Sequence, residues 1–280
     1  ATLNPPKIKM YSLPKGKLIW DFPLHPHEAN FEGGTPWGGI SLDEERDLLF
    51  ITTGNPRPAL YGGDRPGDNK NANSIIVIDL QNRNIKWSFQ EVSHDLWDLD
   101  ISFPPILSTL EIENKKIDIL TVVSKSGNTF VLNRENGKNI FDYEMISVKQ
   151  SKVLNELTSI YQKKSKFPPP LINMEIKKDE LSNLSREIKN YVKDNYKDGK
   201  SGYYIPPILN SKIFLKGPSG GGQWYGGSVN TIDDILYVPI NNIPWELELK
   251  LKNKKDQNTY DYDELSEFDI KNNNLYYQTN

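Results

Sequence analysis

Asp98 and Lys125 are the two residues of this chain whose types and surroundings point most clearly to chemistry. Asp98 ends the run Ser-His-Asp-Leu-Trp-Asp that begins at Ser93, and Lys125 follows 27 residues later in Ser-Lys-Ser-Gly-Asn. A carboxylate beside a tryptophan can act as a general base, and a lysine in the turn after an apolar strand can donate to an oxygen atom. Together they are what a redox site acting on a hydroxyl group needs. The alternative for each is an ordinary solvated turn residue.

Two further carboxylates stand next to this candidate base, in the run His94-Asp-Leu-Trp-Asp-Leu-Asp100. Three carboxylates around one indole need a nearby cation, or raised pKa values, when they are partly desolvated. A general base next to a metal fits this pattern, and so does a plain acidic turn in water. Asp95 and Asp98 could also serve as the paired carboxylates of a glycoside hydrolase.

Two aromatic segments flanked by glycines offer places for a flat ligand. Trp37 lies in Gly-Gly-Thr-Pro-Trp-Gly-Gly (33–39), and Trp224 lies in Gly-Gly-Gly-Gln-Trp-Tyr-Gly-Gly (220–227). Glycine allows close backbone approach, and an exposed indole can stack on a planar molecule. An asparagine follows the next strand in each case, and the amide oxygen of Asn55 could ligate a hard cation such as calcium. Core tryptophans and an ordinary Asn-Pro turn are the alternative interpretations.

The composition argues against several other classes of function. The 34 basic and 37 acidic residues give a formal charge of −3, and the basic residues are scattered, so there is no electrostatic footprint for nucleic acid. No stretch approaches the roughly 20 apolar residues of a membrane helix, and the first 30 residues show no signal-peptide pattern. The chain has no cysteine, which rules out thiol catalysis, and its three histidines are too dispersed for a convincing metal cluster. His25 and His27 are interpreted as polar loop residues.

Short apolar or alternating runs, each bounded by Gly, Asn or Asp, predict an antiparallel all-β architecture. The runs are Lys17–Phe22, Leu48–Thr52, Ser74–Leu80, Ile85–Phe89, Ile117–Val123, Thr129–Asn133, Lys212–Leu215 and Ile235–Pro239. A strand ending in Asp or Asn, a polar turn and a strand centred on Trp or Phe recur at 79–87 and 133–141, with a third copy at 11–20. Such repeats with irregular spacing indicate the blades of a β-propeller.

Residues 142–200 interrupt this pattern and are interpreted as an insertion between blades. Helical spacing of apolar residues predicts about four turns of amphipathic helix there. These residues are Leu181, Leu184, Ile188, Tyr191 and Val192. The tail beyond Leu249 is charged and rich in asparagine, which predicts a surface segment or partial disorder. Both ends look cut, and about three to five blades would make only a partial ring, so we expect a piece of a longer protein.

Taken together, the motifs resemble the quinoprotein dehydrogenases that use pyrroloquinoline quinone (PQQ), and within them the glucose and quinate dehydrogenase-like branch. The resemblance runs from about Lys17 to Trp245, and its most specific parts are HDLWDLD (94–100), SKSGNTFVLNRENG (124–137), and YIPPI followed by GPSGGGQWYGGSV (204–229). It implies an eight-bladed propeller, of which residues 1–280 form one partial domain with the insertion at 142–200. It also implies an oxidoreductase that carries PQQ and a metal, and that oxidises the hydroxyl of a sugar, polyol or alcohol in the periplasm.

The resemblance assigns roles to individual residues. Asp98 resembles the family's base, which takes the substrate's hydroxyl proton as hydride passes to the quinone, and it also belongs to the metal set. Lys125 matches the residue that hydrogen-bonds the quinone oxygens. Trp37 matches the tryptophan that lies flat against the quinone, and Asn55 matches an amide ligand of the metal. The remaining cofactor contacts implied by the resemblance are Trp224 and Asn242.

Asp100 bears on the choice of metal. A second aspartate two residues after the base marks lanthanide-using members of the alcohol branch, whereas glucose-type members share the Trp-Asp-x-Asp pattern and use calcium or magnesium. We therefore expect calcium, with magnesium or a lanthanide as alternatives. Electrons would pass to ubiquinone or to a separate cytochrome, because this chain has no haem-attachment motif. The complete protein would be periplasmic, with or without a membrane association.

Two other classes of protein remain open. A non-catalytic propeller acting as a scaffold or ligand-binding protein would keep blade tryptophans and turn glycines, but it would not need Asp98, Lys125 and Asn55 together. A propeller glycoside hydrolase would use Asp95 and Asp98, but it would leave Lys125 and the glycine-flanked indoles without a role.

Overall fold

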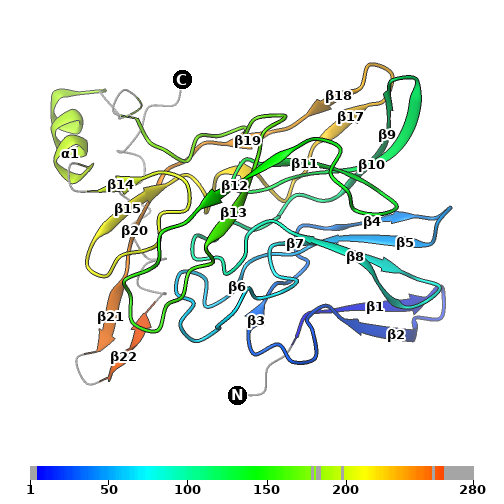
Figure 1. Cartoon of the computed structure of the whole chain (residues 1–280), viewed down its shortest axis with the longest axis horizontal. Helices are drawn as coiled ribbons and strands as arrows, with labels where there is room; N and C mark the ends of the chain where they lie inside the picture. The colour runs from blue at the N-terminus through cyan, green and yellow to red at the C-terminus, as the bar shows by residue number, and fades with distance from the viewer. Residues whose placement is uncertain (1–4, 178–179, 181–183, 197–198, 254–255, 262–280) are drawn as a thin grey trace.

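The computed structural model describes residues 5–177, 180, 184–196, 199–253 and 256–261, and this part of the chain is built from short, mostly antiparallel strands and one helix (Figure 1). The central sheet has four strands in the order β4 (Ile40–Asp43), β5 (Leu48–Thr52), β7 (Ser74–Asp79) and β8 (Asn84–Gln90). Each strand pairs antiparallel with its neighbour, as expected for one propeller blade.

The inner strands β5 and β7 are continuous apolar runs because both faces of this sheet are covered. Successive side chains of a strand point to opposite faces. Ile75 and Val77 pack in one cluster with Leu120 of the following sheet. Ile76 and Ile78 pack in a second cluster with aromatic side chains of the hairpin that precedes the sheet. The central sheet is therefore enclosed between its two neighbours along the chain.

The neighbouring sheets follow the chain outward from this centre. Before it comes the hairpin of β1 (Lys7–Ser12) and β2 (Lys17–Pro23), and after it comes a sheet in the order β11 (Thr129–Asn133), β10 (Lys115–Val123) and β9 (Ile106–Ile112). The further pairs are β3 (Glu32–Gly33) with β6 (Pro56–Arg57), β12 (Tyr143–Ser147) with β13 (Tyr161–Ser165), β16 (Gly221–Gly222) with β19 (Ile240–Asn241), β17 (Ser228–Asn230) with β18 (Ile235–Tyr237), and β21 (Lys250–Asn253) with β22 (Asp256–Asp261). A last sheet has the order β14 (Lys200–Ser201), β15 (Lys212–Leu215) and β20 (Trp245–Glu248). All eight predicted strands are present, with ends within two residues of those expected.

The repeated strand-turn-aromatic pattern has a packing role between sheets. Trp87 in β8 donates from Nε1 to the carbonyl of Arg134 at 3.2 Å, and a Cβ at Gly137 would lie 2.7 Å from its ring. The aromatic of one unit therefore rests on the polar turn of the next. The copies at 11–20 and 79–87 are complete hairpins. The copy at 133–141 is less regular, with a single isolated bridge between Leu132 and Asn139. Its aromatic, Phe141, packs instead against Phe167, with ring centroids 5.0 Å apart.

The predicted helix begins later than its apolar spacing indicates. Helix α1 (Arg186–Tyr196) has 11 residues and lies at the edge of the molecule opposite β1 and β2 (Figure 1). The hydroxyl of Ser185 accepts the backbone N–H of Ile188 at 3.1 Å, so Ser185 is the N-cap that sets the helix start. Leu184 precedes this cap and is exposed, and Leu181 lies outside the described residues.

The environment of His25 corrects one expectation from the sequence. His25 lies in the loop between β2 and β3, as expected, but it is only 5% exposed, and its ring lies 4.4 Å from that of Phe31. Burial lowers the pKa of His25 to about 4, so the imidazole is neutral. His27, two residues later, is exposed as expected.

The C-terminal tail is more regular than its composition indicated, because β21 and β22 pair within it. Residues 262–280 of the same predicted segment lie outside the described residues. No described helix is long and apolar enough to cross a membrane.

Candidate active site

Four loops carry the residues that the sequence singles out. Trp37 lies between β3 and β4, and Asn55 lies between β5 and β6. Asp98 lies in the loop that joins β8 to β9, and Lys125 lies in the turn that joins β10 to β11. Residues from three successive sheets therefore have to converge if they form one site.

Asp100 joins these loops. Its Oδ1 accepts the indole N–H of Trp37 at 3.1 Å and the backbone N–H of Asn55 at 2.7 Å, and its Oδ2 accepts from the ammonium of Lys125 at 2.5 Å. The backbone N–H of Lys125 also donates to the Asp100 carbonyl at 3.0 Å. Gly54 is required here, because a Cβ at this position would lie 2.7 Å from Nε1 of Trp37. The buried carboxylate of Asp100 thus fixes three predicted site residues relative to one another.

Lys125 is shared between two carboxylates. Its Nζ donates to Oδ2 of Asp98 at 2.9 Å as well as to Asp100. The Asp98 side chain is 28% exposed, whereas Lys125 and Asp100 are buried. The cluster of one ammonium and two carboxylates carries an excess negative charge and opens to solvent at Asp98.

This charge balance governs the ionisation of the pair. Burial raises the pKa of Asp98 to about 7; the Lys125 ammonium opposes this rise, and the negative charge of Asp100 adds to it. Burial alone would lower the pKa of Lys125, but Asp100 and Asp98 together raise it above its ordinary value. Lys125 therefore stays charged, while Asp98 can take up and release a proton near neutral pH.

Asp95 fixes the backbone on both sides of Asp98. Its fully buried carboxylate accepts the backbone N–H groups of Trp97 and Leu99, each at 2.8 Å, and the side-chain amide of Asn73 at 2.9 Å. Asp98 has a φ of 58°, a left-handed conformation that is uncommon for a non-glycine residue. The hydrogen bonds from Trp97 and Leu99 to Asp95 stabilise this conformation of Asp98. Because both oxygens of Asp95 are occupied by these donors, Asp95 is unsuited to be the second catalytic carboxylate of a glycoside hydrolase.

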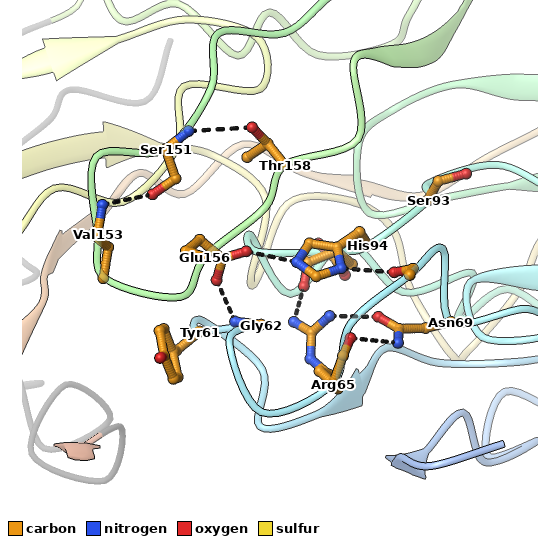
Figure 2. A network of polar contacts seen from close by, with 12 residues as sticks. Tyr61, Gly62, Arg65, Asn69, Ser93, His94, Ser151, Val153, Glu156 and Thr158 are labelled. Atoms are coloured by element: carbon orange, nitrogen blue, oxygen red, sulfur yellow. Dashed lines mark hydrogen bonds and ion pairs between the residues drawn. The ribbon is translucent and has the colours of Figure 1, made fainter. Parts of the chain in front are cut away.

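A second polar network anchors the start of the same loop (Figure 2). Nε2 of buried His94 lies 2.5 Å from Oε1 of Glu156. The other carboxylate oxygen of Glu156, Oε2, accepts the backbone N–H of Gly62. The fully buried guanidinium of Arg65 donates to the carbonyl of Asp95. The segment between β12 and β13, through Glu156, and the loop after β6 therefore hold the first residues of the acidic motif.

The residues present fit one side of a site for a planar quinone. The indole of Trp37 is 44% exposed, and Nζ of Lys125 lies over it, 5.6 Å from the ring centroid. An exposed aromatic face, a permanent cation and the accessible carboxyl group of Asp98 thus lie side by side. These groups would serve as the stacking surface, the donor to quinone oxygens and the proton acceptor that oxidation of a hydroxyl group by a quinone requires.

The same residues fit a metal ion only in part. Asn55 is buried, and its Nδ2 has no hydrogen-bond partner among the described residues. This donor can serve an acceptor atom of a bound molecule, whereas a cation needs the amide oxygen Oδ1. In the described part of the chain, no group of three or more His, Cys, Asp or Glu side chains could hold a metal. Calcium takes about six to eight oxygen ligands. Asn55 and Asp98 would therefore supply part of a coordination shell.

The late glycine-rich segment also reaches the Lys125 turn. Gly221 in β16 has a φ of 59°, and a Cβ there would lie 2.6 Å from the carbonyl oxygen of Lys125. Trp224 follows β16 and Asn242 follows its partner strand β19. The ring of Trp224 is 63% exposed and contacts Tyr225, with centroids 6.2 Å apart. The fold brings these segments to the site, and the roles of Trp224 and Asn242 stay predictions.

Fold and site together define a class of protein: an open, partial β-propeller with a buried lysine-carboxylate cluster beside an exposed tryptophan. A solved structure of quinohemoprotein alcohol dehydrogenase from Comamonas testosteroni is similar in fold, with a TM-score of 0.60 and 23% identity over 90% of this chain and 36% of that one. A europium-containing methanol dehydrogenase is also similar, with a TM-score of 0.57 and 20% identity over 87% of this chain and 41% of that one. The predicted all-β partial propeller is confirmed.

The chain belongs to the family described as "PQQ: Glucose/ethanol/alcohol dehydrogenase, beta-propeller domain", which matches residues 3–279. Quinoprotein glucose dehydrogenase A of Acinetobacter calcoaceticus is 30% identical over 262 residues, which are 85% of this chain and 32% of that protein. Quinate/shikimate dehydrogenase (quinone) of Acinetobacter baylyi is 25% identical over 257 residues, which are 87% of this chain and 32% of that protein. The chain spans between 18% and 36% of the length of such curated relatives. The family predicted from the motifs is confirmed.

Three residues with clear structural roles at the site are absent from the set of candidate site residues taken from the sequence. Asp100 was visible as the second aspartate of the motif, but its contacts with Trp37 and Lys125 join positions 63 and 25 residues away. The sequence of the motif offers Asp95 as a crowded or catalytic carboxylate, and its bonds to the backbone of Trp97 and Leu99 depend on the fold of the loop. Glu156 gave no local signal, because its partner His94 is 62 residues distant.

Proposed function

We propose that this chain supplies the general base and part of the cofactor site of a PQQ-dependent dehydrogenase, and that the complete protein oxidises the hydroxyl group of a sugar, polyol or alcohol. The carrying observation is the Lys125 ammonium shared between Asp98 and Asp100 beside the exposed indole of Trp37. Buried charges are costly to keep for stability alone, and strongly shifted pKa values cluster at functional sites. A scaffold propeller has no need for this arrangement.

Asp98 is the proton acceptor in this proposal. Its carboxyl group is accessible, unlike those of Asp95 and Asp100, and its pKa of about 7 suits proton transfer near neutral pH. The ionised form accepts the hydroxyl proton of the substrate. The Lys125 ammonium, 2.9 Å away, holds Oδ2 of Asp98 in place while the charge changes.

Lys125 and Trp37 are the proposed cofactor contacts. Lys125 keeps its charge because of its two carboxylate partners and can donate to a quinone oxygen. Trp37 is held by its hydrogen bond to Asp100, so its exposed ring face has a fixed orientation for stacking. When bound, PQQ would supply the acceptor for the hydride that leaves the substrate carbon. Trp224 and Asn242 are proposed to complete the contacts from the late blade.

For the metal we propose calcium, with magnesium or a lanthanide as alternatives, bound in part by Asn55 and Asp98. A metal at this position would supply Lewis-acid polarisation of an oxygen ligand. We further propose that residues 1–280 form one partial propeller domain, with the insertion at 142–200. The complete protein would lie in the periplasm and pass electrons to ubiquinone or a cytochrome.

Dye-linked dehydrogenase activity of the complete protein that contains this chain tests the proposal. The protein would be assayed with and without added PQQ and calcium against a panel of aldoses, polyols and simple alcohols. We expect dye reduction that depends on PQQ and on one class of hydroxyl substrate. Glu135→Gln, which removes the exposed partner of Lys86 in the turn after β11, serves as a control that should behave like wild type. A folded protein that does not reduce dye with any of these additions would contradict the proposal.

A further inference from the structure

Glu91 is a fully buried carboxyl group to which the proposed mechanism gives no role. It directly follows β8, and its Oε1 lies 2.7 Å from the hydroxyl oxygen of Ser124 and 2.6 Å from that of Ser126, and accepts from the side-chain amide of Asn128 at 2.8 Å. Ser124 and Ser126 stand on either side of Lys125. Glu91 therefore holds the turn that presents Lys125 to the two aspartates.

The contacts around Glu91 require one more proton than the serines can provide. The hydroxyls of Ser124 and Ser126 also lie 2.7 Å from each other, so three oxygens form a closed triangle of three short contacts. Each such oxygen-oxygen contact needs one proton between its atoms, and each serine hydroxyl carries one proton. The third proton has to come from the carboxyl group of Glu91.

The other oxygen of Glu91 points to the same protonation state. Oε2 is buried and has no hydrogen-bond partner among the described residues. A buried carboxylate oxygen without a donor is much more costly than the carbonyl oxygen of a neutral carboxylic acid. Geometry on both sides of the group thus favours the neutral acid.

We propose that Glu91 is a positioning residue for Lys125, held as a neutral carboxylic acid whose proton closes a hydrogen-bonded ring with Ser124 and Ser126. Ionisation of Glu91 leaves one contact of the ring without a proton and loosens the turn that carries Lys125. The hydrogen-bonded ring stands on the contacts alone, and only its consequence for catalysis rests on the proposed function.

The groups that face Glu91 set the pH range of this effect. Burial raises the pKa of Glu91 to about 7, and the hydrogen bonds from the serines and Asn128 oppose the rise. Asp95, on the same loop, raises it further. Two groups of other elements also face Glu91: Lys163 on β13, whose Nζ donates to the carbonyl of Gln90 at 2.7 Å, and the phenol of Tyr204. Glu91 therefore gains and loses its proton in the same range of pH as Asp98.

Carbon-13 NMR of carboxyl groups in the 280-residue chain tests the proposal without cofactor or turnover. The Glu91 resonance is assigned by its disappearance in Glu91→Gln, and the Asp98 resonance by its disappearance in Asp98→Asn. We expect Glu91 to titrate near pH 7. In Glu91→Ala the pKa of Asp98 should rise by about one, because Lys125 is held less closely. Glu91→Gln keeps a neutral side chain of the same shape but supplies no hydroxyl proton to the ring, so it should raise the pKa of Asp98 by less than Glu91→Ala does. Titration of Glu91 near its ordinary value of 4.5, or an unchanged Asp98 in Glu91→Ala, overturns the proposal.

Two additions keep the test decisive. Where Glu91→Ala does not fold, Ser126→Ala replaces it, because it removes one hydroxyl from the ring and should raise the pKa of Asp98 in the same way. PQQ titration of the complete protein then measures the consequence for Lys125, with at least a tenfold loss of affinity expected for Glu91→Ala and a smaller loss for Glu91→Gln. Wild-type protein that does not bind PQQ contradicts the proposed function and leaves the NMR result on Glu91 standing.

Discussion

Asp100→Asn is the substitution that separates the electrostatics of the site most cleanly from its shape. An asparagine at this position keeps an acceptor oxygen for the indole of Trp37 and the backbone of Asn55, but it removes the negative charge opposite Lys125 and places an NH2 donor there in its stead. The cluster then changes from one cation with two carboxylates to one cation with one carboxylate. The substitution should therefore act mainly on the ionisation of Asp98.

The size of the effect follows from the contacts of Lys125. Oδ2 of Asp98 and Oδ2 of Asp100 both contact the same Nζ, at 2.9 and 2.5 Å, so the two carboxylates lie within about 5 Å of each other. At that separation an effective dielectric constant of about 20 gives a repulsion of about 3 kcal/mol. That energy corresponds to a change of about two in pKa. The pKa of Asp98 should fall from about 7 in the wild type to about 5 in Asp100→Asn.

The assay is the pH dependence of kcat/KM for dye-linked oxidation by the complete protein. In the proposed mechanism the ionised form of Asp98 is the base, so the rate should rise with pH through the pKa of Asp98. The acid limb should lie near pH 7 in wild type and move to lower pH in Asp100→Asn, whatever happens to the maximal rate. Glu135→Gln removes an exposed negative charge elsewhere and should leave the limb in place. An acid limb that stays at its wild-type position, or moves upward, would refute the reasoning about the shared lysine.

Four further predictions concern Asp98, Lys125, Ser185 and Glu91. Asp98→Asn should abolish turnover while PQQ binding is largely kept, as measured by dye reduction and PQQ titration; lost binding in a folded protein would argue against the role of base. Lys125→Ala should weaken PQQ retention, slow reduction and lower the free energy of unfolding in urea by about 3–5 kcal/mol, because Asp100 loses its buried partner; unchanged kinetics would exclude its role. Ser185→Ala should destabilise α1 by about 1 kcal/mol, measured by hydrogen exchange, without changing activity, because it removes an N-cap far from the site; a change in activity would speak against that independence. The folded chain binds a proton at Glu91 more tightly than the unfolded chain, so stability should fall by about 3 kcal/mol as pH rises from 4.5 to about 7, and this part of the pH dependence should vanish in Glu91→Gln.

The fold was largely predictable because its signals are local. The runs Leu48–Thr52 and Thr129–Asn133 are strands with the predicted limits, since apolar runs bounded by turn residues are short-range features of the chain. The helix start was not predictable from apolar spacing, because the hydroxyl of Ser185 decides it. The burial of His25 against Phe31 depends on packing that its polar neighbours in sequence do not reveal.

The candidate site divides in the same way. Asp98 and Lys125 could be named from their motifs, and the structure brings their side chains into contact. The residues that hold them could not be named, because each acts on partners distant in sequence: Asp100 on Trp37, and Glu91 on the two serines beside Lys125. Carboxylates that position a site look the same in sequence as carboxylates that react. Burial distinguishes them here, since Asp100 and Glu91 are buried whereas the side chain of Asp98 is 28% exposed.

PQQ binding by the folded protein tests the central claim most directly. PQQ would be titrated into the complete protein in the presence of calcium, with quenching of tryptophan fluorescence as the signal, and the titration repeated with Lys125→Ala and Trp37→Ala. The account predicts saturable binding at one site in wild type, weaker binding in Lys125→Ala, and loss of a large part of the quenching in Trp37→Ala. Folded wild-type protein that does not bind PQQ, or binding that both variants leave unchanged, would contradict it.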